Sequence, residues 1–140
     1  MLEDDAIALP EEEYLYIQKS QIVGAGDGLY TAVEIYKGET ICMYTGEKLT
    51  FKEANKRAKN GKNRYFISLP NQKILDSMHT FCFAKYANDA SGPGKKLFKN
   101  NAIISLDDSG NVVLKAKQKI KAGEEIFCAY GKKYWKDKMQ

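Results

Sequence analysis

Residues 20–30 read SQIVGAGDGLY, so that Gly24, Gly26 and Gly28 alternate with other residues in one short segment. Glycine adopts positive φ angles without strain and lets another group approach the main chain closely. The spacing differs from GxGxxG, and residues 29–33, which follow, favour a strand over a helix, which argues against a Rossmann dinucleotide site. On its own, the segment predicts a turn between two strands.

Short strand patterns extend outward from this turn in both directions. We expect strands at 14–17, 29–33, 40–44, 65–69, 73–76, 102–106, 112–116 and 125–130, with turn residues between many of them. Thr50 and Glu53 have the spacing of a capping box and predict a helix over 51–60. A short apolar helix or turn is expected over 81–86. The chain is therefore predicted to be mainly β with minor α.

The composition indicates a single soluble domain, because 44% of the 140 residues are hydrophobic and 29% are charged. No apolar run approaches the ~20 residues that span a bilayer, and the acidic N-terminus is unlike a signal peptide. We therefore expect no membrane association and an intracellular location, in the nucleus or the cytoplasm. Cys42, Cys82 and Cys128 are odd in number and far apart, which argues against a disulfide scaffold and a zinc cluster. No bound metal is expected.

The charge is unevenly distributed along the chain. Residues 1–13 carry six acidic residues and no base, and we expect them to form a flexible acidic lead. The rest of the chain sets 22 Lys and Arg against 12 Asp and Glu, a net charge of +10. Six basic residues gather at Lys52, Lys56, Arg57, Lys59, Lys62 and Arg64. This cluster predicts either contact with the phosphates of nucleic acid, nucleosomal DNA included, or a solvated helix face.

Four loose motifs, in this order along the chain, resemble those of SET-domain protein lysine methyltransferases. They are the segment 20–30; Lys37-Gly38-Glu39 with Tyr44-Thr45-Gly46-Glu47; AKYANDA at 84–90, which is similar to the family's RFINHS; and IKAGEEIFCAYG at 120–131, which is similar to I..GEEL..DYG. The resemblance spans residues 14–135 and leaves 136–140 as a C-terminal tail. It implies a SET-domain fold of several small sheets with a knot-like C-terminal segment.

The resemblance also implies an activity, the transfer of a methyl group from S-adenosylmethionine (SAM) to a protein lysine ε-amine, with a histone as one candidate acceptor in chromatin. Two departures from the family leave a second class open, a catalytically silent SET-like module that binds peptide or nucleic acid. Asp89 stands where most relatives have His, and residues 91–100 form an insertion before Asn101, which we align with the family's second Asn. A small nucleic-acid-binding β domain, based on the basic cluster alone, is a third reading.

The motif match assigns expected roles to individual residues. The expected cofactor-binding residues are Gly24, Ala25, Gly26, Asp27, Gly28, Lys85, Tyr86, Asn88, Asp89 and Trp135. Tyr130 resembles the family's catalytic tyrosine, and the channel for the acceptor lysine is expected to be lined by Tyr44, Tyr65, Tyr130 and Tyr134. Asp27 has an alternative role as the cap of its own turn, and Trp135 as an aromatic residue at the edge of the core.

The acceptor amine must be neutral to attack a methyl group. Deprotonating a lysine at pH 7 costs about 4.6 kcal/mol, and an apolar channel lowers this cost because it disfavours the ammonium form. No dedicated base is therefore expected, and His79, the only histidine, lies outside the motifs. By resemblance, the acceptor peptide is expected to pair with a strand edge at 74–77.

Overall fold

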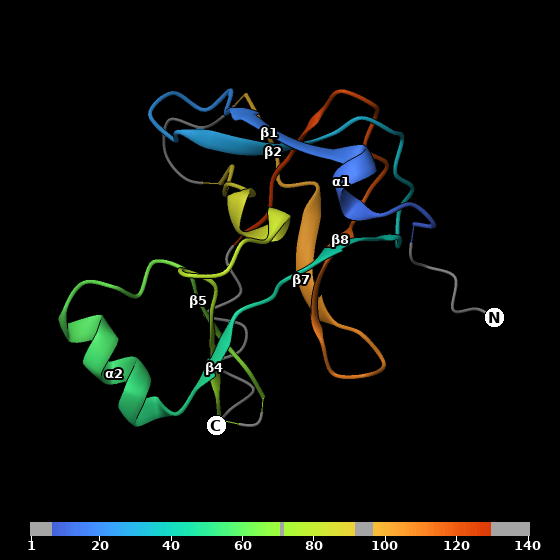
Figure 1. The fold of residues 1–140 in the computed structure, drawn as a ribbon. Coiled ribbons are helices and arrows are strands. Elements are labelled where there is room, and N and C mark those ends of the chain that lie inside the picture. The colour runs from blue at the N-terminus through green and yellow to red at the C-terminus, as the bar shows by residue number, and fades with distance from the viewer. Residues whose placement is uncertain (1–6, 71, 92–96, 130–140) are drawn as a thin grey trace.

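The computed structural model describes residues 7–70, 72–91 and 97–129 (Figure 1). Within these residues, nine strands form three small sheets, with strand orders β1-β2-β9, β3-β8-β7 and β4-β6-β5. The elements are α1 Glu11–Tyr14, β1 Leu15–Lys19, β2 Asp27–Thr31, β3 Thr40–Met43, β4 Glu47–Leu49, α2 Phe51–Lys59, β5 Phe66–Ser68, β6 Ile74–Asp76, the 3-10 helix η1 Phe83–Tyr86, β7 Ala102–Leu106, β8 Val112–Ala116 and β9 Glu125–Ile126. The prediction of a mainly β chain with minor α is confirmed.

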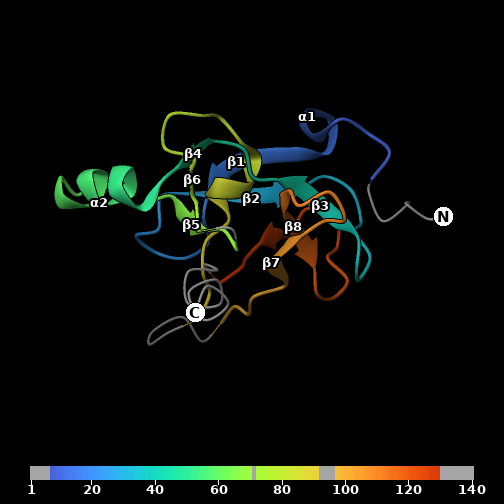
Figure 2. The ribbon, with the colours of Figure 1, turned by 90° about the horizontal axis from the view of Figure 1, so that it is seen from below.

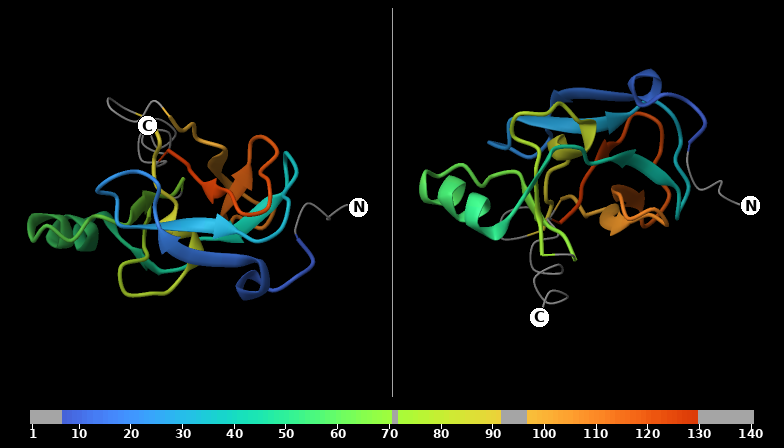
Figure 3. Two further views of the ribbon diagram at one scale, coloured as in Figure 1. Left: turned by 90° about the horizontal axis from the view of Figure 1, so that it is seen from above. Right: turned by 60° about the horizontal axis from the view of Figure 1, so that its bottom comes forward.

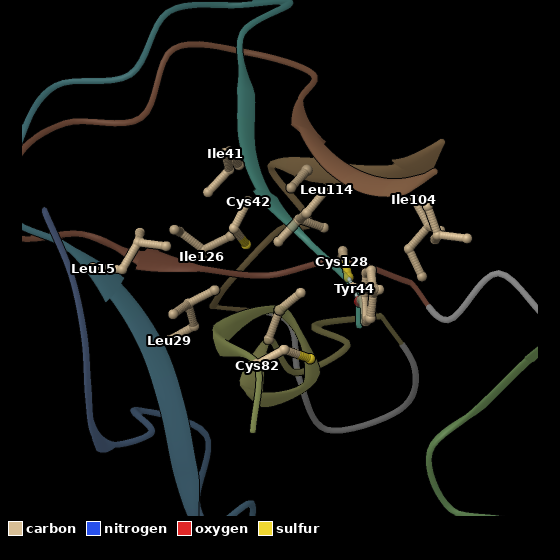
Figure 4. Packing of buried hydrophobic residues seen from close by; sticks show 14 of the residues in the cluster. Leu15, Leu29, Ile41, Cys42, Tyr44, Cys82, Ile104, Leu114, Ile126 and Cys128 are labelled. Carbon is tan, nitrogen blue, oxygen red and sulfur yellow. Dashed lines mark hydrogen bonds between the residues drawn. The ribbon is translucent and has the colours of Figure 1, made fainter. Parts of the chain in front are cut away.

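The first sheet is built around the glycine-rich segment. β1 and β2 are antiparallel, with Lys19 opposite Asp27, and the turn between them contains Gly24 and Gly26. β9 adds to the other side of β2, where Leu29 lies opposite Ile126. Both side chains are fully buried in the main core, which Figure 4 shows from close by. The predicted turn between two strands is confirmed.

The N-terminal segment corrects part of the expected flexible lead. Residues 11–14 form α1, and the first strand begins at Leu15. The Glu11 carboxylate accepts a hydrogen bond from the Met43 amide, and the Tyr14 hydroxyl donates to the carbonyl of Ile41. Since β3 lies at the edge of its sheet, these side chains bind the edge that β8 leaves open. The start of the domain is thus tied to the fold before the first strand.

The second sheet contains the hairpin that the sequence indicates most strongly. β7 and β8 have the predicted bounds 102–106 and 112–116, and Asp107 accepts hydrogen bonds from the amides of Ser109 and Asn111 in the turn. An Asp that bonds to the main chain two residues ahead stabilises such a turn. This prediction is confirmed residue for residue.

The third sheet carries α2, which extends from one end of the molecule in Figures 2 and 3. The capping box is confirmed, because the Thr50 hydroxyl accepts from the Glu53 amide and the Glu53 carboxylate accepts from the Thr50 amide. Ala54 packs with Leu49, Phe66 and Ile74 in a small core of its own. The helix is held on the sheet by this packing.

The expected peptide-binding edge at 74–77 is wrong. β6 is the central strand of its sheet and pairs with both β4 and β5. The expectation was based on family resemblance, and β4, only three residues long, has no alternating pattern that would indicate its pairing with β6. The open edges of this sheet are β4 and β5.

The C-terminal part of the described chain runs between two other segments. The expected strand 125–130 is regular only at Glu125–Ile126. Beyond it, Phe127 forms a parallel bridge with Asn88, and Cys128 forms one with Ala102. The regular strand is short because its continuation makes only isolated bridges, with Asn88 after η1 and with Ala102 at the start of β7. In the part of the chain that the structure describes, no helix is long and apolar enough to cross a membrane.

Candidate cofactor and acceptor site

Three segments that are far apart in the sequence converge beside η1. We call residues 20–28, which contain Gly24, Gly26 and Gly28, the glycine turn. The side-chain amide of Asn88 donates a 2.9 Å hydrogen bond to the main-chain carbonyl of Asp27, where this turn enters β2. The main-chain carbonyl of Asn88 accepts a 2.9 Å hydrogen bond from the main-chain amide of Cys128. Asn88 therefore links the turn to the segment that leads to Tyr130 in the sequence.

The glycine turn has one packed side and one open side. Ala25 packs against a cluster of Ile22, Ala90 and Phe127. Gly24 and Gly26 have φ angles of 83° and 77°, and a Cβ at either position would meet no atom within 4 Å. Among the residues that the structure describes, none places an atom near these two Cβ positions, which leaves the main chain open to the close approach of a ligand.

Glu125 is a buried residue of this site that the sequence analysis missed. Its carboxylate accepts hydrogen bonds from the Ser20 hydroxyl at 2.6 Å, the Gln21 amide at 2.8 Å and the Tyr30 hydroxyl at 3.2 Å. Burial and this carboxylate together raise the pKa of Tyr30. A Cβ at Gly28 would overlap the Glu125 carboxylate. Gly28 is therefore required for close packing of the turn onto β9.

The signal for Glu125 was present in the sequence only as the second glutamate of a Gly-Glu-Glu turn. Asn101, which the alignment did single out, has a comparable task. Its side-chain amide donates to the Glu125 carbonyl at 3.0 Å, and its oxygen accepts from the Phe127 amide at 2.8 Å. Because Asn101 is buried and satisfies both main-chain groups, it fixes the course of the C-terminal segment.

Asp89 is engaged with the base of the insertion. Its Oδ1 accepts hydrogen bonds from the Ser91 amide at 2.8 Å and from the Asn100 side-chain amide at 3.0 Å. Asn100 in turn accepts from the Ala90 amide. The two departures from the family pattern are thus one structural unit, in which the carboxylate closes the loop 91–100 at its two ends.

Two of the expected channel tyrosines meet at one cavity. Tyr44 and Tyr65 line a narrow cavity of about 10 Å³ together with Ser77 and Lys85. The buried Tyr44 hydroxyl lies 3.8 Å from the Cys128 sulfur, and Figure 4 shows the two side chains next to each other. Burial raises the pKa of Cys128 to about 12, so its thiol is neutral. The cavity therefore has aromatic and uncharged walls on the side of the C-terminal segment.

Lys85 and Tyr86, both expected to bind cofactor, lie on η1. The ammonium of Lys85 donates to the carbonyls of Ser77 and Thr80 and stands near the Tyr65 ring, so it belongs to the cavity that Tyr44 and Tyr65 line. Tyr86 is half-buried, with its ring 6.2 Å from that of Phe81. Tyr130, Tyr134 and Trp135 lie outside the described residues, and their roles remain predictions.

One residue of the predicted basic cluster, Arg57 on α2, forms ion pairs within the fold. Arg57 donates to Asp76 at 2.7 Å and to Glu47 at 2.8 Å, and Asp76 is fully buried. The side-chain hydrogen bonds from Arg57 lower the pKa of Glu47. A tertiary ion pair, invisible in the local sequence, thus already uses the charge of Arg57. Within the described ranges, no group of three His, Cys, Asp or Glu residues could hold a metal ion.

Solved structures with the same arrangement define the class of domain. The structure described as ctPRC2 in an autoinhibited conformation bound to S-adenosylmethionine matches with a TM-score of 0.70 and 26% identity, over 84% of this chain and 15% of that chain. A humanized mutant of the Chaetomium thermophilum Polycomb Repressive Complex 2, bound to the inhibitor GSK343, matches with the same values. The fold is therefore that of a SET domain.

The family follows from the sequence match. The family model described as SET domain matches residues 26–131, and the chain belongs to the SET-domain family. The histone-lysine N-methyltransferase EZ1 of Zea mays is 30% identical over 127 residues, which are 89% of this chain and 13% of that protein. The histone-lysine N-methyltransferase trr of Drosophila melanogaster is 30% identical over 120 residues, 83% of this chain and 5% of that protein. The chain thus spans a small part of the length of these relatives.

Proposed function

We propose that this chain transfers a methyl group from SAM to the ε-amine of a protein lysine. The observation that carries the proposal is the link that Asn88 makes between the glycine turn and the segment before Tyr130. Relatives that bear the name histone-lysine N-methyltransferase support the activity. A similar structure bound to S-adenosylmethionine supports the cofactor.

The open side of the glycine turn fits such a cofactor. Gly24 and Gly26 leave the main chain accessible, and the exposed Asp27 carboxylate can receive a ligand ammonium. By resemblance, Asn88 would hold the methionyl end and Trp135 would cover the adenine. When bound, SAM supplies an electrophilic methyl group on a positively charged sulfur.

The acceptor lysine would pass between Tyr44 and Tyr65, whose cavity of about 10 Å³ would have to widen to admit it, toward Tyr130. Removal from water between these side chains disfavours the ammonium form of the lysine, which must lose its proton before the reaction. No described residue is assigned the role of a base, since His79 lines a different hollow with Lys56 and Lys62. The contribution of the protein is mainly to align the reacting atoms.

We propose a histone tail as the acceptor, and consequently the nucleus as the place of action. An extended tail can add to a sheet edge through main-chain hydrogen bonds. Of the two open edges of the third sheet, β5 begins directly after Tyr65. A tail paired with β5 would therefore present a lysine to the channel.

Calorimetric titration with SAM tests the cofactor site. We expect saturable binding by the wild type and a tenfold to hundredfold loss of affinity in Asn88→Ala, because the side-chain amide that holds the glycine turn in place is removed. Asn60→Ala, at the exposed end of α2, is the matched control and should bind as the wild type does. Absence of heat from the wild type at millimolar SAM would contradict the proposal.

The silent binding module is the second candidate, and the Asp89 unit favours it. The Asp89 carboxylate bonds to Ser91 and Asn100 at the base of the insertion, and an acid at this position differs in its chemistry from the histidine of most relatives. A wild-type protein that binds SAM and histone peptide but transfers no methyl group would establish this candidate.

We further propose contact with nucleosomal DNA through the remaining basic residues, Lys52, Lys56, Lys59, Lys62 and Arg64, all exposed. Fluorescence anisotropy with a 30-base-pair duplex at several salt concentrations tests this. Each phosphate contact contributes about −0.9 to the slope of log K against log[salt]. Lys56→Gln with Lys59→Gln should reduce the slope, whereas Lys119→Gln should not. Equal slopes for all three proteins would exclude this surface.

A further inference from the structure

We infer that Lys85 supplies a fixed positive charge at the wall of the acceptor channel and thereby favours the neutral form of the acceptor amine. The inference rests on the methyltransferase function proposed above. Lys85 lies on η1, half-buried, and lines the same narrow cavity as Tyr44 and Tyr65. The family resemblance suggested a role at the cofactor for this residue, whereas its side chain lies at the channel.

The ammonium of Lys85 is held in place by groups that do not cancel its charge. It donates hydrogen bonds to the carbonyls of Ser77 at 2.9 Å and Thr80 at 3.1 Å. It also lies 5.1 Å from the centroid of the Tyr65 ring and 5.8 Å from that of Tyr86. Carbonyl oxygens and ring faces attract a cation through partial charges only. Among the described residues, no carboxylate forms an ion pair with Lys85.

The other charged or titratable groups around the cavity leave its field positive. The guanidinium of Arg64 lies 5.3 Å from the centroid of the same Tyr65 ring. Asp76, which precedes Ser77, is already paired with Arg57. The Cys128 thiol beside Tyr44 is neutral, because burial raises its pKa to about 12.

Two further groups complete these surroundings. The carboxylate of Asp89 is directed to Ser91 and Asn100. Cys82, just before η1, is a buried free thiol. None of the described residues that line the cavity is a carboxylate, and the field of Asp89 reaches it only from the side of Cys128, whose pKa it helps to raise.

A second ammonium that enters this cavity meets a like charge, and a like charge nearby disfavours the protonated form of an amine. The acceptor ε-ammonium releases its proton to water, which leaves the lone pair on nitrogen that the reaction needs. A neutral amine experiences no such repulsion. Lys85 would thus act in addition to the aromatic walls, and without accepting a proton itself.

The pH dependence of kcat/KM on a histone peptide tests the inference. In Lys85→Gln, which keeps a donor to the carbonyls but removes the charge, we expect the acid limb to move up by roughly one pH unit. The rate at pH 7 should fall about tenfold, while calorimetry still detects SAM binding. Lys85→Arg should keep the wild-type acid limb. The control is Lys119→Gln, because Lys119 lies over the Tyr36 ring and pairs with Glu34, both outside the channel lining.

An acid limb in Lys85→Gln that superimposes on that of the wild type would overturn the inference. If Lys85→Gln does not fold, the pKa of the acceptor amine can be measured on the wild-type protein instead. A peptide with a ¹⁵N-labelled acceptor amine, bound in the presence of S-adenosylhomocysteine, which has no sulfonium, is titrated by NMR. We expect its pKa to lie below the ordinary lysine value of about 10.4, and an unchanged value would overturn the inference. A wild type that neither binds SAM nor transfers methyl groups would instead refute the proposed function itself.

Discussion

The hydroxyl of Ser20 donates a 2.6 Å hydrogen bond to the carboxylate of Glu125, which lies 105 residues later in the chain. This bond joins the start of the glycine turn to β9. Because the Gln21 amide bonds to the same carboxylate, Glu125 fixes the position of the whole turn relative to the C-terminal segment. The candidate cofactor site therefore depends on a residue that would not itself touch the cofactor.

Replacement of Glu125 by alanine is expected to destabilise the fold and the site together. The change leaves the Ser20 hydroxyl and the Gln21 amide without their acceptor, at a cost of about 2–4 kcal/mol in the free energy of unfolding. Urea denaturation measures this loss. Glu124→Ala, at an exposed neighbouring position, is the control, and equal losses in the two variants would show that the buried carboxylate has no special role.

Two glycines of the turn should respond differently to substitution. A Cβ at Gly28 would overlap the Glu125 carboxylate and stand 3.2 Å from the Ser20 Cα, so Gly28→Ala should lose about 1–3 kcal/mol of stability through overpacking. Gly24→Ala meets no neighbouring atom and costs about 1 kcal/mol for its positive φ, but it should weaken SAM binding. Thermal unfolding and calorimetry on both variants check this. A Gly28→Ala protein as stable as the wild type would contradict the packing.

Arg57 is expected to be a structural residue within a surface of solvated lysines. Arg57→Met leaves the fully buried Asp76 without its counter-charge, and breaking such a pair is strongly destabilising. The melting temperature should fall by several degrees, whereas Lys59→Met should change it little. If Arg57→Met weakened DNA binding without any loss of stability, the structural role of Arg57 would be mistaken.

The buried thiols predict a loss of stability at alkaline pH. Burial raises the pKa of Cys128 to about 12, above its unfolded value of about 8.5. A raised pKa stabilises the folded state fully below pH 8.5 and progressively less as the pH rises toward 12. Each such thiol lowers stability by about 1.4 kcal/mol per pH unit in this range.

Chemical denaturation of Cys128→Ala at pH 8, 9 and 10 measures this contribution. We compare the slopes of stability against pH, since the cavity left by the substitution lowers stability equally at every pH. The variant should have a shallower slope than the wild type by the contribution of one thiol. Parallel slopes would mean that Cys128 does not titrate with a raised pKa.

Local sequence signals were sufficient for elements whose stability is local. The β7–β8 hairpin follows from the turn at Asp107, and α2 follows from the capping box of Thr50 and Glu53. The order of strands in the third sheet was not accessible, because β4 has three residues and is stabilised only by its pairing with β6. The pairing of β4 with β6 therefore had to be seen in the structure before the peptide edge expected by resemblance at 74–77 could be corrected.

The site was predictable to the extent that motifs are contiguous. The motif match indicated Asn88 and the glycine turn, which the structure brings together. It could not indicate that Lys85 lies at the channel cavity or that Asp76 uses the charge of Arg57. Each of these contacts joins residues from separate elements, and nothing in the local pattern of the chain specifies the partner.

The central claim is that Tyr130 acts where the glycine turn and Asn88 meet. The most direct measurement is the incorporation of labelled methyl groups from SAM into core histones by the wild type and by Tyr130→Phe, with SAM affinity measured on the same samples. We predict a loss of about a hundredfold or more in rate, as for removal of a hydroxyl that aligns or stabilises the reacting atoms, with SAM still bound. Equal incorporation by the two proteins would contradict the account.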